Sequence, residues 1–410
     1  MPRETLCRSC GGSELCGILS LGSMPLANAL RTKEQLELPE SQFPLHLVLC
    51  EECSLVQITE TVPPDKLFGE YPYLTSFSDT MVNHAADLVR RLIKERRLGE
   101  SSLVAEIASN DGYLLLVYQE AGIPVLGVEP ALNIASIAMK RGVRTVCKFF
   151  SAELAKTLMS DFGQADVIHG HNVLAHVADL NGVVRGFRLL VKDTGVIVVE
   201  APYVRDMIEK VEFDTIYHEH LCYFSLTALD KLFSRHGLAI HDVERLDIHG
   251  GSLRIFAGVE GSGQERSSRI LNLLEEEDRD GTGCVEFYLS FAERVERLKK
   301  ELVTLLRGLR SEEKTIAAYG ASAKGSTLLN YFGIGSAEID FVVDRSTVKQ
   351  GWYTPGTHLP IRAPEALLKE QPDYVLLLTW NFAEEILQQQ EPYRCRGGRF
   401  IIPIPALQVV

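Results

Sequence analysis

The sequence lacks the positive charge that nucleic acids and anionic membrane surfaces attract. Its 42 Lys and Arg stand against 55 Asp and Glu, a net charge of −13 over 410 residues. No apolar run approaches the roughly 20 residues of a membrane span, and the printed N-terminus has no apolar signal-peptide core. We therefore expect a cytoplasmic protein, most simply a monomer, with no nucleic-acid or membrane partner. A phosphate-bearing small molecule stays possible, because it needs only a few local donors.

The composition is ordinary for a folded protein, with 46% hydrophobic and 24% charged residues. A chain of this length usually divides into two or three domains.

The nine cysteines are unevenly spaced. Cys7 and Cys10 form one CxxC pair, and Cys50 and Cys53 form another. Each pair presents two thiolates from one turn, and two turns can close a tetrahedral zinc site with no open position. The alternative is four unrelated buried cysteines. The spacing predicts a structural zinc ion, with a strand or two between the pairs, because reduced thiols are expected without export.

Alternating strands and helices follow from about residue 81. A helical pattern precedes a short buried strand at 103–107, and a second strand, 125–128, ends in Glu129 and Pro130. Glu129 lies 23 positions after Glu106, where a carboxylate can accept hydrogen bonds from both ribose hydroxyls of a nucleoside. Strands at 166–168 and 195–200 extend the pattern. This predicts a doubly wound sheet with ligands at the carboxyl ends of its strands.

The turn after the first of these strands lacks the G-x-G-x-x-G run of dinucleotide-binding proteins. It resembles methyltransferase motif one, E/D-x-G-x-G-x-G, which starts here at Glu106. Ala108 and Asn110 stand where glycines are usual, and only Gly112 remains. An unrelated α/β turn is the alternative interpretation.

Histidines gather where the later strands end. Residues 169–176 contain three, and Tyr217-His218-Glu219-His220 follows the fifth strand. A single such histidine is more often a satisfied, partly buried side chain, but several at strand ends indicate a site. The H-E-x-x-H pattern of zinc proteases is absent around His218.

A second α/β unit is predicted near the C-terminus. An apolar stripe over 285–309 predicts a long connecting helix, preceded by an acidic loop at 275–278. A strand at 315–319 then enters a Gly/Ser turn with Lys324, which can bind phosphate through backbone amides and an ammonium group, although it is no Walker loop. Strands at 339–344 and 374–379 follow, the latter ending at Trp380, which could stack on a base or sugar or close a core.

In order, the motifs are CxxC…CxxC, EIASNDGY, GVEP, HNVLAHV, YHEHLCYFS, HGGSLR and GASAKG. This order resembles the deoxysugar C-methyltransferase family over nearly the whole chain, and YHEHxxYFS is its most specific part. The resemblance implies S-adenosylmethionine-dependent C-methylation of a dTDP-linked 4-keto sugar in antibiotic pathways. It implies an α/β fold: a small zinc-binding module at 1–72, a central Rossmann-like methyltransferase domain at 73–250, and a C-terminal Rossmann-like domain for the nucleotide sugar at 251–410.

The resemblance also implies roles. His220 is the expected base that removes a proton beside the ketone, and Glu219 orients it or contacts substrate. Tyr217 and His176 hold the ketone oxygen or the sugar, and Tyr71 reaches over from the zinc module. Expected cofactor residues are Glu106, Ala108, Asn110, Asp111, Gly112, Glu129, Pro130 and Asn172. Expected substrate residues are His249, Ser252, Ser322, Lys324, Trp380 and Asn381.

Other functions remain open at this point. One is an O- or N-methyltransferase on a related nucleotide sugar, another an NAD-dependent nucleotide-sugar oxidoreductase or epimerase, and a third a catalytically silent sugar-binding protein. The methylated carbon is C-3, or C-5 as in some relatives. The sugar, its nucleotide, an amino group at C-3 and the stereochemistry are not fixed by the sequence.

Overall fold

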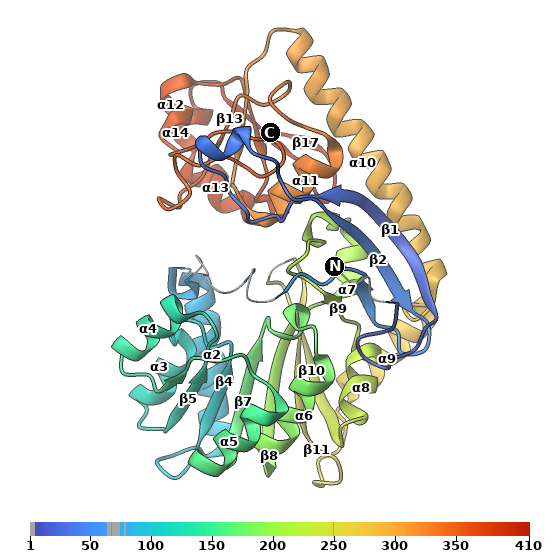
Figure 1. Ribbon diagram of the computed structural model, residues 1–410, viewed down its shortest axis with the longest axis vertical. Coiled ribbons are helices and arrows are strands. Elements are labelled where there is room, and N and C mark those ends of the chain that lie inside the picture. Colours follow the sequence, from blue (N-terminus) through green and yellow to red (C-terminus); the bar gives the residue numbers. More distant parts are fainter. Residues whose placement is uncertain (1–4, 64–66, 68–73, 78, 249) are drawn as a thin grey trace.

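The computed structural model describes residues 5–63, 67, 74–77, 79–248 and 250–410. Tyr71 and His249, both expected in the site, lie outside the described residues. Within the described residues the strands form three β-sheets, and Figure 1 shows the central sheet and the C-terminal sheet at opposite ends of the molecule. No described helix is long and apolar enough to cross a membrane.

The N-terminal sheet is antiparallel, in the order β1-β2-β3-β9. Its strands are β1 (Leu15–Met24), β2 (Phe43–Cys50), β3 (Val56–Ile58) and β9 (Cys222–Tyr223). The strands expected between the cysteine pairs are therefore confirmed. The connection between β1 and β2 contains the 3-10 helix η1 (Glu34–Glu37) and reaches the C-terminal domain, where the Arg31 N–H bonds the Tyr353 carbonyl at 3.0 Å. Because β9 immediately follows the Y-H-E-H block, this sheet also anchors that block.

The central sheet has seven strands in the order β10-β11-β8-β7-β4-β5-β6. These are β4 (Val104–Ile107), β5 (Val125–Val128), β6 (Thr145–Val146), β7 (Ala165–His171), β8 (Val191–Pro202), β10 (Leu238–Leu246) and β11 (Ser252–Val259). Strands β4 to β8 are parallel, whereas β11 runs antiparallel between β8 and β10. The sheet thus extends to Val259, and the expected division at residue 250 falls inside its last hairpin.

Helices cover both faces of this sheet, which is why its strands read as continuous apolar runs. Val196 and Val198 pack with the first helices on one face, and Ile197 and Val199 belong to the larger core on the other. The helical segments of this region are η2 (Thr75–Phe77), α2 (Asp79–Arg96), α3 (Tyr113–Glu120), α4 (Leu132–Lys140), α5 (Ala152–Phe162), η3 (Leu174–His176), α6 (Leu180–Leu190), α7 (Val204–Glu209), η4 (Phe213–Thr215) and α8 (Leu226–Ser234).

The strand order reverses at β4, which has β5 on one side and β7 on the other. In an open parallel sheet this switch point leaves a crevice at the carboxyl ends of the strands, where ligands bind. The turns that follow β4, β5 and β7 are therefore the places to look for a site.

Two helices connect the central and C-terminal domains, α9 (Ser268–Asp280) and α10 (Val285–Ser311). The long α10 runs along one side of the molecule beside β1 (Figure 1). The acidic loop expected at 275–278 was wrong, because these residues belong to α9. Glu277 is buried there and accepts hydrogen bonds from the Tyr203 hydroxyl at 2.9 Å and the Leu226 N–H at 2.7 Å.

The C-terminal sheet has the order β14-β13-β12-β15-β16-β17, parallel except at β17. Its strands are β12 (Ile316–Tyr319), β13 (Phe341–Val343), β14 (Ile361–Arg362), β15 (Tyr374–Leu377), β16 (Arg399–Ile402) and β17 (Gln408–Val409). Its helices are α11 (Ala323–Phe332), α12 (Ala366–Glu370), η5 (Trp380–Phe382), α13 (Ala383–Gln389) and α14 (Glu391–Arg394). Here the order reverses at β12, so the turn before α11 lies at a second switch point.

Candidate active site

A cavity of about 560 Å³ opens at the carboxyl ends of β4, β5 and β7. Its wall includes the turns after these strands, the end of β8, the Y-H-E-H block and one side chain of the C-terminal domain. The expected site residues that line it are Glu106, Ala108, Asn110, Glu129, Pro130, Asn172, His176, Tyr217, His220 and Lys324. Residues expected for cofactor, base and phosphate binding thus share one space.

The turn after β4 has the backbone shape that glycines usually provide. Ala108 and Asn110 adopt left-handed conformations with φ of 54° and 48°, and Gly112 follows with φ of 80°. Such angles are uncommon outside glycine, although asparagine tolerates them. A Cβ on Gly112 would meet Val143 at 2.9 Å, so this position also needs a glycine for space.

Two carboxyl groups lie at this end of the cavity. Glu129 is held by two backbone donors, the Asn110 N–H at 3.0 Å and the Ala131 N–H at 2.9 Å. Burial raises the pKa of Glu129, while these two hydrogen bonds oppose the shift. Burial and the neighbouring Glu129 raise the pKa of Glu106 further, so Glu106 favours its neutral form. Its buried Oε2 has no hydrogen-bond partner among the described residues. Glu129 is therefore fixed at the strand end where a carboxylate can accept hydrogen bonds from ribose hydroxyls, and its acceptor oxygens fit such a cofactor.

Asp111 and Gly112 lie behind the turn rather than on the cavity wall. Asp111 is fully buried and pairs with Arg141 at 2.9 Å. Their contribution at this end is to hold the turn.

His220 is fixed by contacts at both ring nitrogens. Its Nδ1 lies 2.9 Å from the Thr215 carbonyl and its Nε2 lies 2.8 Å from the Tyr217 hydroxyl. A carbonyl can only accept, so Nδ1 carries the proton and Nε2 is the acceptor in the neutral ring. The imidazole is therefore held in the tautomer that can take up a proton at Nε2.

The other members of the block have distinct surroundings. Glu219 is buried off the cavity wall, and its Oε1 accepts a 2.7 Å hydrogen bond from Asn28 of the N-terminal module. Its backbone carbonyl bonds His176 Nδ1 at 2.7 Å, which places the His176 ring 4.8 Å from that of His220. Burial lowers the pKa of His176, so this ring is neutral. His218 turns away, with Nε2 3.0 Å from the Pro44 carbonyl.

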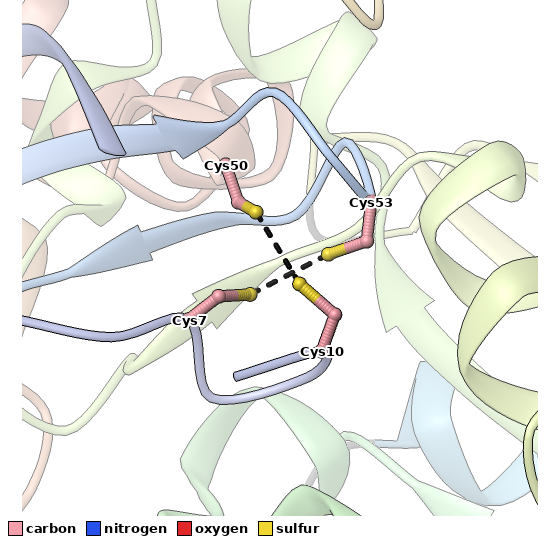
Figure 2. Close-up of side chains that lie close together, drawn as sticks. All are labelled: Cys7, Cys10, Cys50 and Cys53. Atoms are coloured by element: carbon pink, nitrogen blue, oxygen red, sulfur yellow. Dashed lines mark hydrogen bonds between the residues drawn. The ribbon is translucent and has the colours of Figure 1, made fainter. Parts of the chain in front are cut away.

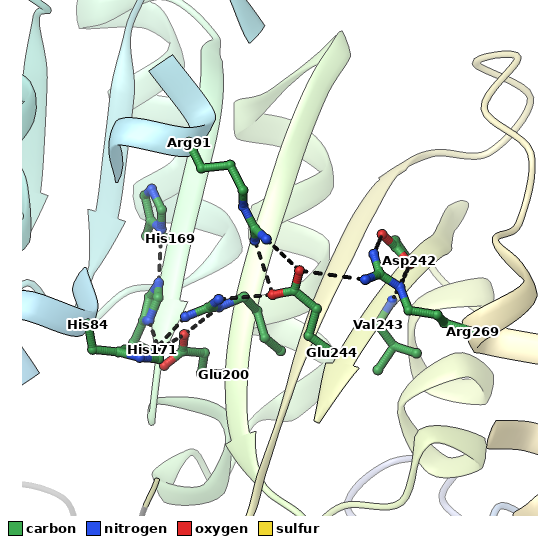
Figure 3. A network of polar contacts seen from close by, with 10 residues as sticks. His84, Arg91, His169, His171, Glu200, Asp242, Val243, Glu244 and Arg269 are labelled. Atoms are coloured by element: carbon green, nitrogen blue, oxygen red, sulfur yellow. Dashed lines mark hydrogen bonds and ion pairs between the residues drawn. The ribbon is translucent and has the colours of Figure 1, made fainter. Parts of the chain in front are cut away.

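A buried polar network around Glu200 lies beside the cavity, and Figure 3 shows its side chains. His171 lines the cavity, with Nδ1 3.1 Å from Glu200 Oε2 and Nε2 2.9 Å from His169. Arg254 and His84 also bond Glu200, at 2.6 and 3.0 Å. Burial would raise the pKa of Glu200, but His171, His84 and Arg254 together hold it well below its usual range. Since His84 belongs to α2 and Glu200 to β8, the network fixes that helix to the central sheet.

The C-terminal domain contributes Lys324, at the start of α11. Its buried Nζ lies 4.5 Å from the centre of the Trp380 ring. Trp380 itself is 8% exposed and donates from Nε1 to Asp214 at 2.7 Å. Ser322 caps α11 by accepting from the Gly325 N–H at 3.0 Å.

The remaining expected substrate residues that the structure describes lie off the cavity wall. Ser252 is buried at the start of β11 and donates to the Ile248 carbonyl at 3.2 Å, and Asn381 is half-buried in η5. Among the described residues, Lys324 alone of the expected substrate set lines the cavity.

Three further residues take part in the site and were not expected from the sequence. Glu212 lines the cavity near Lys324, Asp214 binds Trp380, and Asn28 binds Glu219. Each is an isolated residue with no motif around it, so no local signal marked it.

The four cysteines of the N-terminal module meet as expected (Figure 2). All four sulfur atoms lie within 4.8 Å of one another, with Cys7–Cys53 at 3.4 Å and Cys10–Cys50 at 3.5 Å. Sulfurs of a tetrahedral four-thiolate zinc site are about 3.8 Å apart. The hydrogen bond between Cys7 and Cys53 lowers the pKa of the Cys53 thiol and raises that of Cys7, so Cys53 is the first of the two to become a thiolate. The donor set fits a structural zinc ion.

Known protein families match all three regions of the chain. Three family models match: a zinc binding domain at 7–68, a methyltransferase domain at 80–243 and a C-methyltransferase C-terminal domain at 247–405. With the fold and cavity, they define an S-adenosylmethionine-dependent methyltransferase that carries a structural zinc module. C-methyltransferase NovU of Streptomyces niveus is 39% identical over 404 residues, covering 98% of this chain and 96% of NovU. The chain belongs to this C-methyltransferase family.

Solved structures are more distant. Magnesium protoporphyrin IX methyltransferase of Synechocystis PCC 6803 with bound S-adenosylmethionine is 15% identical, covers 48% of this chain and 89% of that one, and gives a TM-score of 0.35. The PH0226 protein of Pyrococcus horikoshii OT3 is 14% identical, covers 48% and 99%, and gives 0.38. Likenesses of this size carry no conclusion about substrate.

Proposed function

We propose that this enzyme methylates C-3 of a dTDP-linked 4-keto-deoxysugar. The observation that carries the proposal is the position of His220. It holds an unprotonated Nε2 in a cavity that is also lined by Glu129, which follows β5, and by Lys324, whose buried ammonium comes from the C-terminal domain. C-methylation needs a carbon nucleophile, and a ketone makes the hydrogen on its neighbouring carbon acidic enough for a histidine to remove.

The base step uses His220 and Tyr217. Nε2 of His220 takes the C-3 proton, and the electron pair of the C–H bond moves to the C-4 oxygen as an enolate. The Tyr217 hydroxyl is close enough to His220 to turn its hydrogen bond to that oxygen and stabilise the developing charge. The Thr215 carbonyl stabilises the resulting imidazolium at Nδ1.

Binding at the two ends positions the reactants. Glu129 accepts hydrogen bonds from the ribose hydroxyls of the cofactor, and Glu106, Ala108, Asn110, Pro130 and Asn172 form the rest of that end. Bound S-adenosylmethionine supplies an electrophilic methyl group on a positive sulfur. Lys324 binds the diphosphate of the substrate, supported by Trp380 and by the α11 N-terminus that Ser322 caps. The proposed site also keeps the other catalytic and substrate residues that the resemblance implies: Glu219, Tyr71, His249, Ser252 and Asn381.

The test is the position of the new methyl group. The purified chain is incubated with S-adenosylmethionine labelled with carbon-13 in its methyl group and with dTDP-4-keto-deoxysugars, and the product is examined by NMR. The proposal expects the labelled methyl on C-3, with loss of the C-3 proton signal. A methyl on oxygen or nitrogen would refute C-methylation of this substrate, and a methyl on C-5 would correct the position.

A further inference from the structure

Glu212 presents an unsatisfied carboxyl group to the cavity. The residue is 3% exposed and lines the wall immediately before η4. Its Oε1 is buried with no hydrogen-bond partner among the described residues. A Cβ on Gly250 would lie 2.2 Å from Glu212 Oε2, so the glycine loop after β10 packs against the carboxyl and leaves no room for a side chain at residue 250. Burial raises the pKa of Glu212 to about 7, with Lys324 opposing the shift and Asp214 adding to it.

Lys324 faces the same part of the cavity from the C-terminal domain. Its Nζ is buried and has no hydrogen-bond partner among the described residues, although it lies over the Trp380 ring. An unpaired buried acceptor and an unpaired buried donor each cost folding free energy. Such groups are few in native proteins, and a catalytic or binding role is one of the explanations for them. This pair therefore indicates a ligand with both a donor and an anionic acceptor.

The position of Glu212 relative to the proposed base, His220, limits the chemical class of that ligand. The 3-10 helix η4 begins directly after Glu212 and ends at Thr215, whose carbonyl fixes His220. Three residues of 3-10 helix rise roughly 6 Å, the scale of one sugar ring. Glu212 and His220 both line the cavity, and Glu212 lies close enough to Lys324 for the two charges to interact.

We propose that Glu212 accepts a hydrogen bond from a hydroxyl or amino substituent on the acceptor's sugar ring, beside the phosphate held by Lys324. Glu212 is then a specificity-determining residue that selects sugars with a donor at that ring position. The inference rests on the proposed function, because it takes the acceptor to be a nucleotide-linked sugar.

The experiment compares Glu212→Gln with Glu209→Gln, which alters an exposed carboxylate on the neighbouring helix α7. Methyl transfer is measured with dTDP-4-keto-6-deoxyglucose and its 2-deoxy and 3-deoxy analogues, and S-adenosylmethionine affinity is measured by calorimetry. We expect Glu212→Gln to raise the KM for the parent sugar about 10- to 100-fold, as for loss of a hydrogen bond to a charged group. For the analogue that lacks the recognised group, the same substitution should change KM by less than about threefold. Cofactor affinity and the Glu209→Gln enzyme should match wild type.

Two results would overturn the inference while leaving the proposed function intact: an unchanged KM, or an equal loss on every analogue. Loss of cofactor affinity along with sugar affinity would also overturn it, since the carboxyl would then act on the whole cavity. Glu212→Asp keeps the charge and should retain part of the selectivity if Glu212→Gln does not fold. Absence of any methylated sugar with the wild-type chain would refute the proposed function and this inference together.

Discussion

The indole N–H of Trp380 donates a hydrogen bond to Asp214 at 2.7 Å, across 166 residues of sequence. Asp214 is fully buried in η4. The carbonyl of the next residue, Thr215, accepts a hydrogen bond from the Nδ1–H of His220. The C-terminal domain therefore contacts the segment that orients the proposed base. Because Lys324 lies over the same indole, the residues proposed to bind phosphate and to position the base share one cluster.

Replacing Trp380 with Phe should keep the ring beneath Lys324 and remove the donor to Asp214. We expect the free energy of unfolding to fall by about 1–3 kcal/mol, because a buried carboxyl loses its partner. We also expect kcat to fall more than cofactor affinity, because η4 carries the Thr215 carbonyl. Thermal unfolding and steady-state kinetics measure both. Trp352→Phe is the matched control at the other tryptophan, which is 38% exposed; equal effects in the two variants would contradict the assignment.

His220→Ala should bind S-adenosylmethionine like wild type, since the hydrogen bonds of the His220 ring go to Tyr217 and Thr215 and not to the residues around Glu129. Turnover should fall by about 100- to 10,000-fold, the usual contribution of a general base. Calorimetry and product formation by mass spectrometry separate the two effects. His241→Ala, a change on strand β10 outside the cavity, is the control. Near-full activity in His220→Ala would show that another group removes the proton.

The stability of the ligand-free enzyme should depend on pH through Glu212. Burial raises its pKa from 4.5 to about 7, so the folded chain holds this proton more tightly than the unfolded chain. The stability that this bound proton contributes is fully present below the pKa that Glu212 has in the unfolded chain. It is lost as the pH rises through the pKa of Glu212 in the folded chain.

Glu212→Gln cannot ionise and should therefore gain stability relative to wild type, by up to about 3 kcal/mol, between about pH 5 and pH 8. Thermal midpoints at several pH values measure the difference, with Glu209→Gln as control. A difference that stays constant over this range would mean that Glu212 is not buried as described.

Zinc should be held by the four cysteines and should stabilise the N-terminal sheet. We expect about one zinc ion per wild-type chain and a large loss in Cys10→Ser, since four thiolates complete the site. Because β9 joins this sheet next to the Y-H-E-H block, turnover should fall as well. Elemental analysis and thermal unfolding provide the measurements. Cys16→Ser, in the same module but outside the cluster, should keep its zinc; equal zinc in both variants would contradict the assignment.

Much of the fold could be predicted because local patterns determine it. Buried apolar strands that alternate with helices indicate a parallel sheet, and such a sheet brings Glu106 and Glu129 to one edge. The two CxxC pairs predict their own meeting, since a metal site needs all four thiolates. By contrast, α9 was missed because its acidic residues hide the apolar spacing of Ile270 and Leu273.

The rest of the site depends on contacts between distant segments. Asn28 meets Glu219 across 191 residues, and Trp380 meets Asp214 across 166. The turn at Ala108 and Asn110 departs from the glycine pattern but keeps the left-handed backbone, which the surrounding structure has to stabilise. Propensity and spacing do not register such relationships, so the sequence indicated the motif residues of the cavity, such as His220 and Tyr217, but not Glu212.

The most direct test of a base-generated carbon nucleophile is mass spectrometry and NMR of the reaction in deuterated water. The chain is incubated with dTDP-4-keto-deoxysugars, first without and then with S-adenosylmethionine. We predict exchange of hydrogen for deuterium beside the ketone in the absence of cofactor, abolished in His220→Ala, and methylation at that same carbon when the cofactor is added. Methylated product without a carbon-bound methyl, or neither exchange nor methylation on any sugar of the panel, would contradict the account.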